Sequence, residues 1–402
     1  MVALSPCRMV PAGMVKPRSQ ASEQGTVTVT ALAAGGDGVA RDEQGRVVFV
    51  PRSAPGDVVE IDYVDRKASY ARGRIARIVT PAPSRREPPC AAYAAGCGGC
   101  QWLHVDEATQ RHAKRELVVN GLRRVLHGVA VNEVVTQSPA LGWRRRARLH
   151  VVAGHVGFYA MASHRVVAFE QCPQLDAQLA PAVAAVRASA PVDGEIAIAV
   201  AHDGTVATHR VGEPNPPLIE IDAGVFVPVD GFAQASRAGN AALVAAVVDA
   251  LAAQRPNAAG PARVLELFAG AGNFTRALVA AGHVVTASDV VAPARWPWAS
   301  NFVTGAAHTV TAQFVIGDFD AVVLDPPRAG AKEVMAELLR LEPATIIYVS
   351  CDVATLARDV EMLVTQNYRL VSATPHDLMP QTAHIETVVV LARIAVVTPP
   401  AE

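Results

Sequence analysis

The sequence predicts an α/β protein in three parts: a small N-terminal β-barrel, a central α+β domain and a C-terminal doubly wound, mostly parallel sheet. Three observations predict this. Short β-rich runs crowd residues 24–80, cysteines cluster in residues 85–222, and strand-like and helix-like runs alternate through residues 223–402. Such alternation favours a parallel sheet with helices on both faces. Residues 1–23 show no periodicity and are expected to form a flexible arm.

The composition is that of a chain with sizeable cores, since 51% of its 402 residues are hydrophobic and 18% are charged. No apolar run reaches the roughly 18–20 residues that span a bilayer. The longest candidate, Ala241–Ala253, is interrupted by Asp249, and the first 20 residues show no signal-peptide pattern. We therefore expect a cytoplasmic monomer without a membrane partner.

Charge is distributed unevenly along the chain. Residues 1–170 carry 23 Lys and Arg against 14 Asp and Glu, whereas residues 171–402 carry 13 against 23, and the net charge is -1. A basic front half is typical of a protein that meets a polyanion such as RNA. A solvated basic surface explains the charge alone equally well.

The barrel is expected from four β runs separated by turn signals such as the Gly-Gly-Asp-Gly run at 35–38. The runs are Thr26–Ala31, Arg46–Pro51, Asp57–Val64 and Ala71–Val79. Strands so closely spaced favour a small barrel. Arginines around its last strand flank Tyr63 and Tyr70, a combination typical of single-stranded nucleic-acid binding.

The central domain contains four of the six cysteines. They are Cys90, Cys97, Cys100 and Cys172. In a cytosolic protein, clustered cysteines are more often metal ligands than disulfides. A C-x6-C-x2-C run with a distant fourth cysteine suits either zinc or an iron–sulfur cluster, and the spacing leaves both open.

Regular elements are expected through the rest of the chain. In the central domain they are a helix near Val105–Leu126 and strands near Ala147–Val152 and Val156–Tyr159. In the C-terminal part the strands are Val264–Phe268, Val284–Ser288, Ala321–Leu324, Ile346–Val349 and Thr387–Ala392, and the helices include Thr275–Ala281, Val334–Leu341 and Thr355–Thr365. The arginine run 144–148 is expected to grip phosphates together with the barrel.

The first C-terminal strand runs into a glycine-rich turn and then a helix. Gly270 and Gly272 allow the backbone to approach a ligand at the helix N-terminus. The third glycine of a dinucleotide site is replaced by Thr275, and Asp289 ends the next strand, where a carboxylate can hold ribose hydroxyls. The spacing favours an adenosine nucleoside without a pyrophosphate, S-adenosyl-L-methionine. A plain strand–helix turn is the alternative.

Two other strand ends carry reactive side chains. Asp325 opens an Asp-Pro-Pro-Arg run after one strand, and Cys351 follows the next strand just before a helix. Sheets of this class place their ligands at the carboxyl ends of strands. A helix N-terminus lowers the pKa of a thiol, so Cys351 is expected to favour the thiolate. A small buried cysteine is the alternative.

A thiolate in this place meets a specific chemical need. Uracil carbon 5 is too electron-poor to take a methyl group unaided, and addition of a thiolate to carbon 6 makes it nucleophilic. A base must then remove the proton from carbon 5 before the thiolate leaves. Glu386, just ahead of the last strand, is the candidate base, with a solvated carboxylate as the alternative. The target base must leave its stack to reach Cys351.

These motifs resemble the RNA uracil-5 methyltransferase family, and within it the RumA-type enzymes of 23S ribosomal RNA rather than the tRNA enzymes. The resemblance runs from Gly25 to Ile394. Its most specific stretch, Phe319–Asp359, contains LDPPRAG, YVSC and ATLARD.

The resemblance implies a Rossmann-like class I methyltransferase domain, an RNA-binding TRAM barrel and a 4Fe–4S cluster. It implies that Cys351 is the nucleophile and Glu386 the proton-abstracting base. The implied cluster ligands are Cys90, Cys97, Cys100 and Cys172. The implied cofactor contacts are Gln234, Phe268, Gly270, Gly272, Asn273, Asp289 and Asp325, and the implied contact to the flipped base is Phe232.

Three features depart from the family pattern. The first cysteine gap is one residue longer than expected, and Asp289 stands where a glutamate is expected. The stretch 289–319 looks shortened, with no full helix and a weak strand near Val310–Ile316. The adenine contact is therefore unassigned, and Trp296 or Trp298 is the candidate to cover that face of the pocket.

Three other functions remain open from the sequence. A tRNA uracil-5 methyltransferase shares the chemistry, although the barrel and the cysteine cluster argue against it. An RNA-binding or chaperone-like protein with a weakened cofactor site is suggested by the shortened stretch. A radical enzyme also pairs such a barrel with a cluster, but it needs a C-x3-C-x2-C loop that this sequence lacks.

Overall fold

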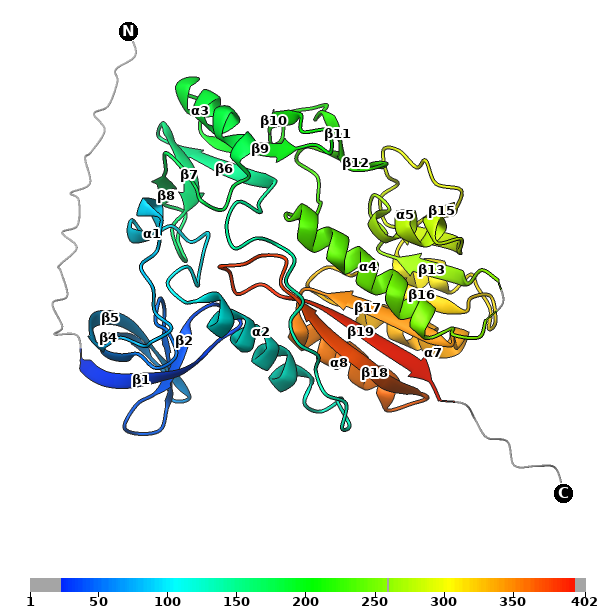
Figure 1. The fold of residues 1–402 in the computed structure, drawn as a ribbon, viewed down its shortest axis with the longest axis horizontal. Helices are drawn as coiled ribbons and strands as arrows, with labels where there is room; N and C mark the ends of the chain where they lie inside the picture. The colour runs from blue at the N-terminus through cyan, green and yellow to red at the C-terminus, as the bar shows by residue number, and fades with distance from the viewer. Residues whose placement is uncertain (1–22, 259, 395–402) are drawn as a thin grey trace, which may run out of the picture.

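The structure is a computed structural model that describes residues 23–258 and 260–394 (Figure 1). The expected N-terminal arm lies outside the described residues apart from its last one. A closed barrel, a five-stranded central sheet and a seven-stranded C-terminal sheet follow one another along the chain. The predicted α/β class with an N-terminal barrel is therefore confirmed. In the described part of the chain, no helix is long and apolar enough to cross a membrane.

The barrel closes because its fourth strand pairs back with its first, for example Val59 with Val27. Alternate residues such as Val27 and Val29 are buried inside it, as the two-residue period of a strand requires. All four strands predicted for the barrel are present. The prediction omitted the short strand Gly38–Arg41, which follows the Gly-Gly-Asp-Gly turn. The strands, in spatial order, are β1 (Gln24–Leu32), β2 (Gly38–Arg41), β3 (Val47–Val50), β5 (Tyr70–Thr80) and β4 (Val58–Arg66).

Within the described residues, the central region contains a five-stranded antiparallel sheet and four helical segments. The sheet order is β10 (Val206–Arg210), β9 (Gly194–Val200), β6 (Arg146–Val152), β7 (His155–Tyr159) and β8 (Val166–Ala168). A separate hairpin joins β11 (Leu218–Asp222) to β12 (Val225–Pro228). The helices are α1 (Ala91–Ala94), α2 (Glu107–Leu122), the 3-10 turn η1 (Ala177–Leu179) and α3 (Ala180–Ala188).

The C-terminal sheet carries the predicted alternation of strands and helices. Its order is β15 (Asn301–Thr304), β14 (Val284–Asp289), β13 (Arg263–Leu267), β16 (Ala321–Leu324), β17 (Thr345–Ser350), β19 (Glu386–Arg393) and β18 (Tyr368–His376). The first five are parallel, and β19 runs antiparallel to both of its neighbours. The helices are α4 (Arg237–Ala253), α5 (Asn273–Ala280), α6 (Ala307–Thr311), η2 (Lys332–Val334), α7 (Met335–Leu341) and α8 (Val353–Val364).

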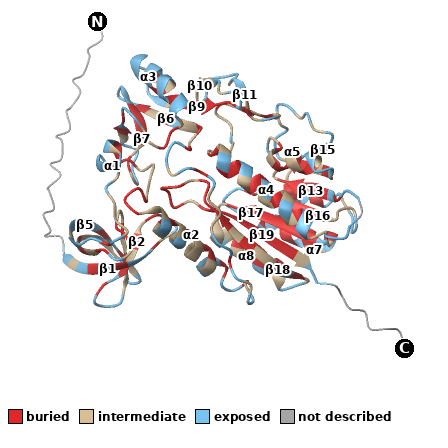
Figure 2. Ribbon diagram, viewed as in Figure 1, coloured by how far each residue is buried: buried red, intermediate tan, exposed pale blue. Residues whose placement is uncertain are grey.

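Helices cover both faces of this sheet, so its central strands β16 and β17 are buried throughout (Figure 2). On β17, Ile346 and Tyr348 face the core beneath α2, α7 and α8, whereas Ile347 and Val349 face the core beneath α4 and α5. Helix α2 precedes the central sheet in sequence but packs on α8 of the C-terminal part. The front half of the chain thus contributes directly to the C-terminal core.

The shortened stretch after β14 folds differently from the sequence reading. The expected strand near Val310–Ile316 is wrong, because that segment contains the end of α6 and a turn. Asp318 accepts a hydrogen bond from the Val315 amide at 2.7 Å and so stabilises the turn. The strand next to β14 is instead β15, and residues 290–300 reach it without a helix.

Candidate active site

Three candidate catalytic side chains meet at one edge of the C-terminal sheet. Asp325 follows β16, Cys351 follows the adjacent parallel strand β17, and Glu386 begins β19. In the antiparallel pair β17–β19, Ser350 lies opposite Thr387. The next position of this register places Cys351 opposite Glu386, at a Cα separation of about 5 Å. The fold therefore brings together residues that are distant in sequence.

The electrostatics of this edge oppose ionisation of all three groups. Burial, together with the carboxylates of Glu386 and Asp325, raises the pKa of the Cys351 thiol to about 11, although the Arg328 guanidinium acts to lower it. The expectation that the helix N-terminus makes Cys351 a ready thiolate is therefore wrong. Burial and two carboxylates outweigh the dipole of α8, whose cap residue is Asp352.

The carboxyl groups of Glu386 and Asp325 are both buried and lie close enough for their charges to interact. Burial raises the pKa of Glu386 well above its ordinary value, and Asp325 adds to the effect. Burial also raises the pKa of Asp325, to about 7. Glu386 is only 4% exposed, and its Oε2 has no hydrogen-bond partner among the described residues. A buried carboxyl with a free oxygen beside a thiol can accept a proton from a substrate held between them.

The cofactor loop joins β13 to α5 with left-handed backbone at Phe268, Gly270 and Gly272 (φ 61°, 54° and 85°). A left-handed phenylalanine is strained by roughly 1–3 kcal/mol and is typical of ligand-binding turns. Asp289 accepts a hydrogen bond from the Gly270 amide at 2.9 Å, so its carboxylate holds the loop and stands beside it. Asn273 at the start of α5 exchanges two 2.9 Å amide hydrogen bonds with Asn240 of α4. The structure thus gathers these predicted cofactor residues around one turn.

Two tryptophans occupy the place where the expected helix is missing. A Cβ on Gly272 would meet the Trp298 indole nitrogen at 2.6 Å and the Trp296 ring at 3.0 Å. Trp298 also lies against Gly224, at the turn of the β11–β12 hairpin. The indoles therefore cover the glycine loop. Sequence reasoning missed Thr304, which the β14–β15 register places opposite Asp289 and so beside the cofactor loop.

The segment that carries Phe232 and Gln234 connects β12 to α4. Phe232 is 79% exposed, while Gln234 is half-buried. Arg145 and Arg146 donate to backbone carbonyls of this segment, and Arg145 is 1% exposed and paired with Asp222 at 2.7 Å. The expectation that the whole arginine run grips phosphates is therefore wrong for these two residues.

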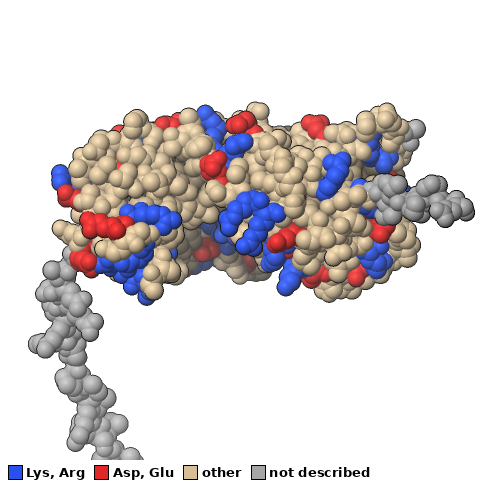
Figure 3. Space-filling view, turned by 90° about the horizontal axis from the view of Figure 1, so that it is seen from below, with Lys and Arg blue, Asp and Glu red and all other residues tan. Residues whose placement is uncertain are grey.

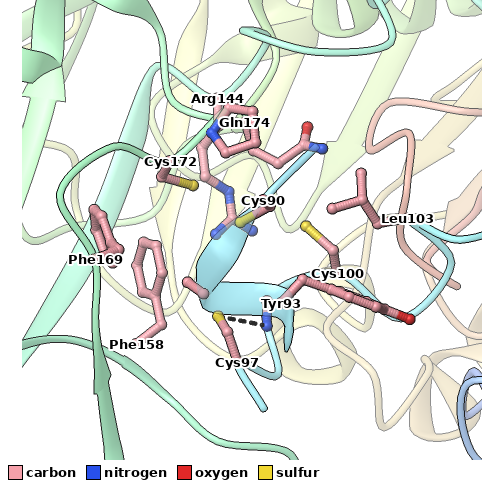
Figure 4. A pocket seen from close by; sticks show the side chains of 13 residues that line it. Cys90, Tyr93, Cys97, Cys100, Leu103, Arg144, Phe158, Phe169, Cys172 and Gln174 are labelled. Atoms are coloured by element: carbon pink, nitrogen blue, oxygen red, sulfur yellow. Dashed lines mark hydrogen bonds between the residues drawn. The ribbon is translucent and has the colours of Figure 1, made fainter. Parts of the chain in front are cut away.

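The four predicted cluster ligands, far apart in sequence, line one cavity of the central region (Figure 4). They are Cys90, Cys97, Cys100 and Cys172. Burial raises the pKa of Cys97, of Cys172 and, to about 12, of Cys100, whereas the Arg144 guanidinium lowers all three. Within the described residues, no group of three His, Cys, Asp or Glu side chains is placed to hold a metal ion. The structure brings the four thiols to the lining of one cavity.

Basic side chains gather on one face of the molecule. Figure 3 shows Lys and Arg over the barrel side and across the middle of this face, with acidic groups among them. On the barrel, Arg74 and Arg77 pair with Asp62 and Glu60 across the β5–β4 ladder. Such exposed ion pairs are worth about 0–1 kcal/mol, so these arginines can exchange them for phosphates.

Known proteins resemble this chain over most of its length. Residues 312–394 match the family model described as tRNA (Uracil-5-)-methyltransferase, and residues 20–76 match the TRAM domain. The 23S rRNA (uracil(1939)-C(5))-methyltransferase RlmD of Salmonella typhimurium is 30% identical, over 92% of this chain and 96% of its own. The chain belongs to the RNA uracil-5 methyltransferase family. The resemblance read from the sequence is thereby confirmed.

Two further proteins match this chain over at least 90% of its length. An uncharacterized RNA methyltransferase of Bdellovibrio bacteriovorus is 34% identical, over 90% of this chain and 93% of its own. A Pyrococcus abyssi tRNA (uracil-54, C5)-methyltransferase, solved with S-adenosyl-L-homocysteine, covers 92% of this chain and all of its own with a TM-score of 0.71. At 21% identity, that likeness concerns the fold.

Proposed function

We propose that this protein methylates carbon 5 of a uracil in RNA, with 23S ribosomal RNA as the substrate, through a covalent bond between Cys351 and the base. The observation that carries the proposal is the register that places Cys351 opposite Glu386 at the carboxyl edge of the sheet. That edge also holds Asp325 and adjoins the left-handed glycine turn. Relatives named for the same reaction support it over nearly the whole chain.

The cofactor residues fit S-adenosyl-L-methionine, which when bound supplies an electrophilic methyl group. Gly270 and Gly272 leave the loop backbone open, Asp289 stands where ribose hydroxyls can be held, and Thr304 lies opposite Asp289 on the neighbouring strand. Phe268, Asn273, Gln234 and Asp325 complete the proposed set. Trp298 has a buried indole N–H without a partner among the described residues, next to the same loop.

Each catalytic side chain then has one task. Cys351 adds to carbon 6 of the uracil as the thiolate, and this addition makes carbon 5 nucleophilic. Asp325, whose pKa of about 7 leaves it partly protonated, can donate a hydrogen bond to a carbonyl oxygen of the base. Once carbon 5 carries the methyl group, Glu386 as carboxylate removes the proton of that carbon, and elimination releases Cys351.

Two experiments test this function. The first is titration of the purified protein with S-adenosyl-L-methionine by calorimetry. Micromolar binding supports the pocket that Trp298 and Thr304 complete. Failure to bind at millimolar ligand favours the alternative of an RNA-binding protein with an idle site. The second is release of tritium from RNA labelled at uracil carbon 5, which requires the base step itself.

The choice of RNA needs its own comparison. Relatives named as 23S rRNA enzymes match over 92–95% of this chain, which favours ribosomal RNA. The tRNA alternative is favoured by the family model at 312–394. Tritium release from 23S rRNA transcripts but not from tRNA transcripts supports the first choice, and the reverse pattern supports the second. Cytoplasmic location and a monomeric state stay predictions.

We also propose that the cysteine cavity holds a 4Fe–4S cluster. The lining fits an anionic, sulfur-rich group, because two N–H donors, the Nε2 of Gln174 and the Nε of Arg144, are buried there without partners among the described residues. Gln174 is 3% exposed, and a buried polar group left unpaired costs about 1–3 kcal/mol. A single zinc ion, whose thiolates lie at about 2.3 Å from the metal, is the alternative occupant.

Metal analysis of anaerobically purified protein decides between these occupants. Four irons and four sulfides per chain, lost together in Cys172→Ala, would support the cluster. One zinc per chain would replace it with a structural zinc site. The proposed methyl transfer involves no redox step, so either result leaves the roles of Cys351 and Glu386 untouched.

A further inference from the structure

The segment between β12 and α4, residues 229–236, is held by its carbonyl groups. Arg146 of β6 donates from Nη1 to the Ala233 carbonyl at 2.9 Å and from Nη2 to the Gly231 carbonyl. Arg145 donates from Nε to the Gln234 carbonyl at 3.1 Å. The two carbonyls that Arg146 binds belong to the residues on either side of Phe232, so one guanidinium fixes the backbone before and after that ring.

A guanidinium is suited to this task. It is planar, carries its donors in a rigid fork and stays charged, whereas an ammonium is a point charge that cannot span two carbonyls in fixed geometry. Arg146 is half-buried, and burial together with Arg148, Arg145 and Arg144 lowers its pKa to about 10. It therefore remains cationic at neutral pH.

The result of this anchoring is an exposed aromatic ring on a fixed backbone. Phe232 is 79% exposed, the most exposed of the large apolar side chains in the described chain. At the end of the segment, Ser236 caps α4 by accepting a hydrogen bond from the Gly239 amide at 3.1 Å. Helix α4 carries Asn240, which pairs with Asn273 of the cofactor loop. The ring and the cofactor loop thus belong to one connected unit.

We propose that Arg146 is a positioning residue that holds Phe232 ready to stack on an RNA base. This inference rests on the proposed function, because it takes RNA as the partner of the ring. Stacking of a base on an aromatic side chain is worth more when the ring needs no ordering on binding. Arg146 itself touches no substrate; it acts only through the carbonyls of Gly231 and Ala233.

A double-mutant cycle tests the inference. The variants are Arg146→Met, Arg146→Lys, Phe232→Ala and the double variant Arg146→Met with Phe232→Ala, assayed for RNA affinity by filter binding and for kcat and KM by tritium release. We expect Arg146→Met and Phe232→Ala each to weaken RNA binding about tenfold. In the Phe232→Ala background, Arg146→Met should have no further effect, and Arg146→Lys should recover part of the loss.

Arg210→Met is the matched control. Arg210 lies on the same sheet and also bridges two carbonyls of a turn, those of Val192 and Asp193, but it does not touch residues 229–236. It should leave RNA affinity unchanged. Additive losses in the cycle, or an equal loss in Arg210→Met, would overturn the positioning role. If Arg146→Met does not fold, Arg146→Lys carries the cycle.

The readouts separate this inference from the proposed function. Filter binding reports stacking even when no methyl group is transferred. A wild-type protein that binds RNA, shows the cycle and releases no tritium would leave Arg146 in its role and remove the methylation chemistry. A wild-type protein that methylates RNA but shows no coupling between Arg146 and Phe232 would support the methylation chemistry and remove the positioning role of Arg146.

Discussion

Replacement of Glu386 by glutamine isolates the proton-removal step. The substitution preserves size, and the structure records no side-chain hydrogen bond at Oε2 that would be broken. Loss of a general base costs about 10²–10⁴-fold in turnover. Addition of Cys351 to carbon 6 precedes that step, so Glu386→Gln should accumulate a methylated protein–RNA adduct instead of product.

The same substitution should change the Cys351 thiol in a calculable way. The β-carbons of directly opposed residues on paired strands lie about 5 Å apart. Two unit charges at that separation interact by about 3 kcal/mol at an effective dielectric constant of about 20. The thiol is half-buried, and solvent screening roughly halves this, leaving about 1.5 kcal/mol, or about one pKa unit. The pKa of Cys351, raised to about 11 in the wild type, should therefore fall by about one unit in Glu386→Gln.

Alkylation of the apo protein by iodoacetamide, followed at the Cys351 peptide by mass spectrometry, measures this shift. At pH values where Glu386 is protonated, wild type and Glu386→Gln should react equally. Once Glu386 ionises, the variant should react about tenfold faster, because its thiolate no longer faces a carboxylate. Equal rates across the whole range would mean that the two side chains do not interact, and normal turnover would mean that another group is the base.

Three other outcomes are expected. Cys351→Ala should abolish turnover and covalent trapping on 5-fluorouracil RNA without changing the thermal midpoint; any retained turnover removes Cys351 as the nucleophile. Burial raises the pKa of Glu266 from 4.5 to about 8. The folded protein therefore holds a proton that the unfolded chain releases between these pH values. The contribution of Glu266 to the free energy of unfolding is complete below about pH 4.5 and falls by about 1.4 kcal/mol per pH unit up to about pH 8. Glu266→Gln should remove that part of the pH dependence of unfolding, and an unchanged slope would show that Glu266 titrates normally. Trp298→Leu should lower the free energy of unfolding by about 1–2 kcal/mol, since a half-buried ring loses part of the 3–5 kcal/mol of a core aromatic; an unchanged denaturation midpoint would contradict its packing on Gly272 and Gly224.

The sequence predicted the fold class because its signals are local. Strand periodicity, glycine turns and proline-bounded loops all depend on neighbouring residues, and they located β13, β16 and β17 to within a residue or two. The same kind of signal failed at Val310–Ile316. There β-branched residues occupy a turn stabilised by Asp318, and that contact overrides their strand propensity.

The site was predicted only in part. Motif spacing identified Cys351, Asp325 and Asp289, because each follows a recognisable strand. It could not show that Cys351 lies opposite Glu386, since that depends on the register of an antiparallel strand that returns from far along the chain. It also gave the wrong expectation for the Cys351 thiol, because burial and facing carboxylates are properties of the assembled site.

The arginine run shows most clearly what the sequence determines and what only the tertiary structure decides. The sequence determined that residues 144–148 are basic, and the charge pattern pointed to phosphates. Only the tertiary structure decided that Arg145 is buried against Asp222 and that Arg146 binds the carbonyls around Phe232. A sequence fixes which charges and hydrogen-bond donors a chain carries. Whether a donor meets solvent, a carboxylate or a backbone carbonyl depends on which distant segment packs against it.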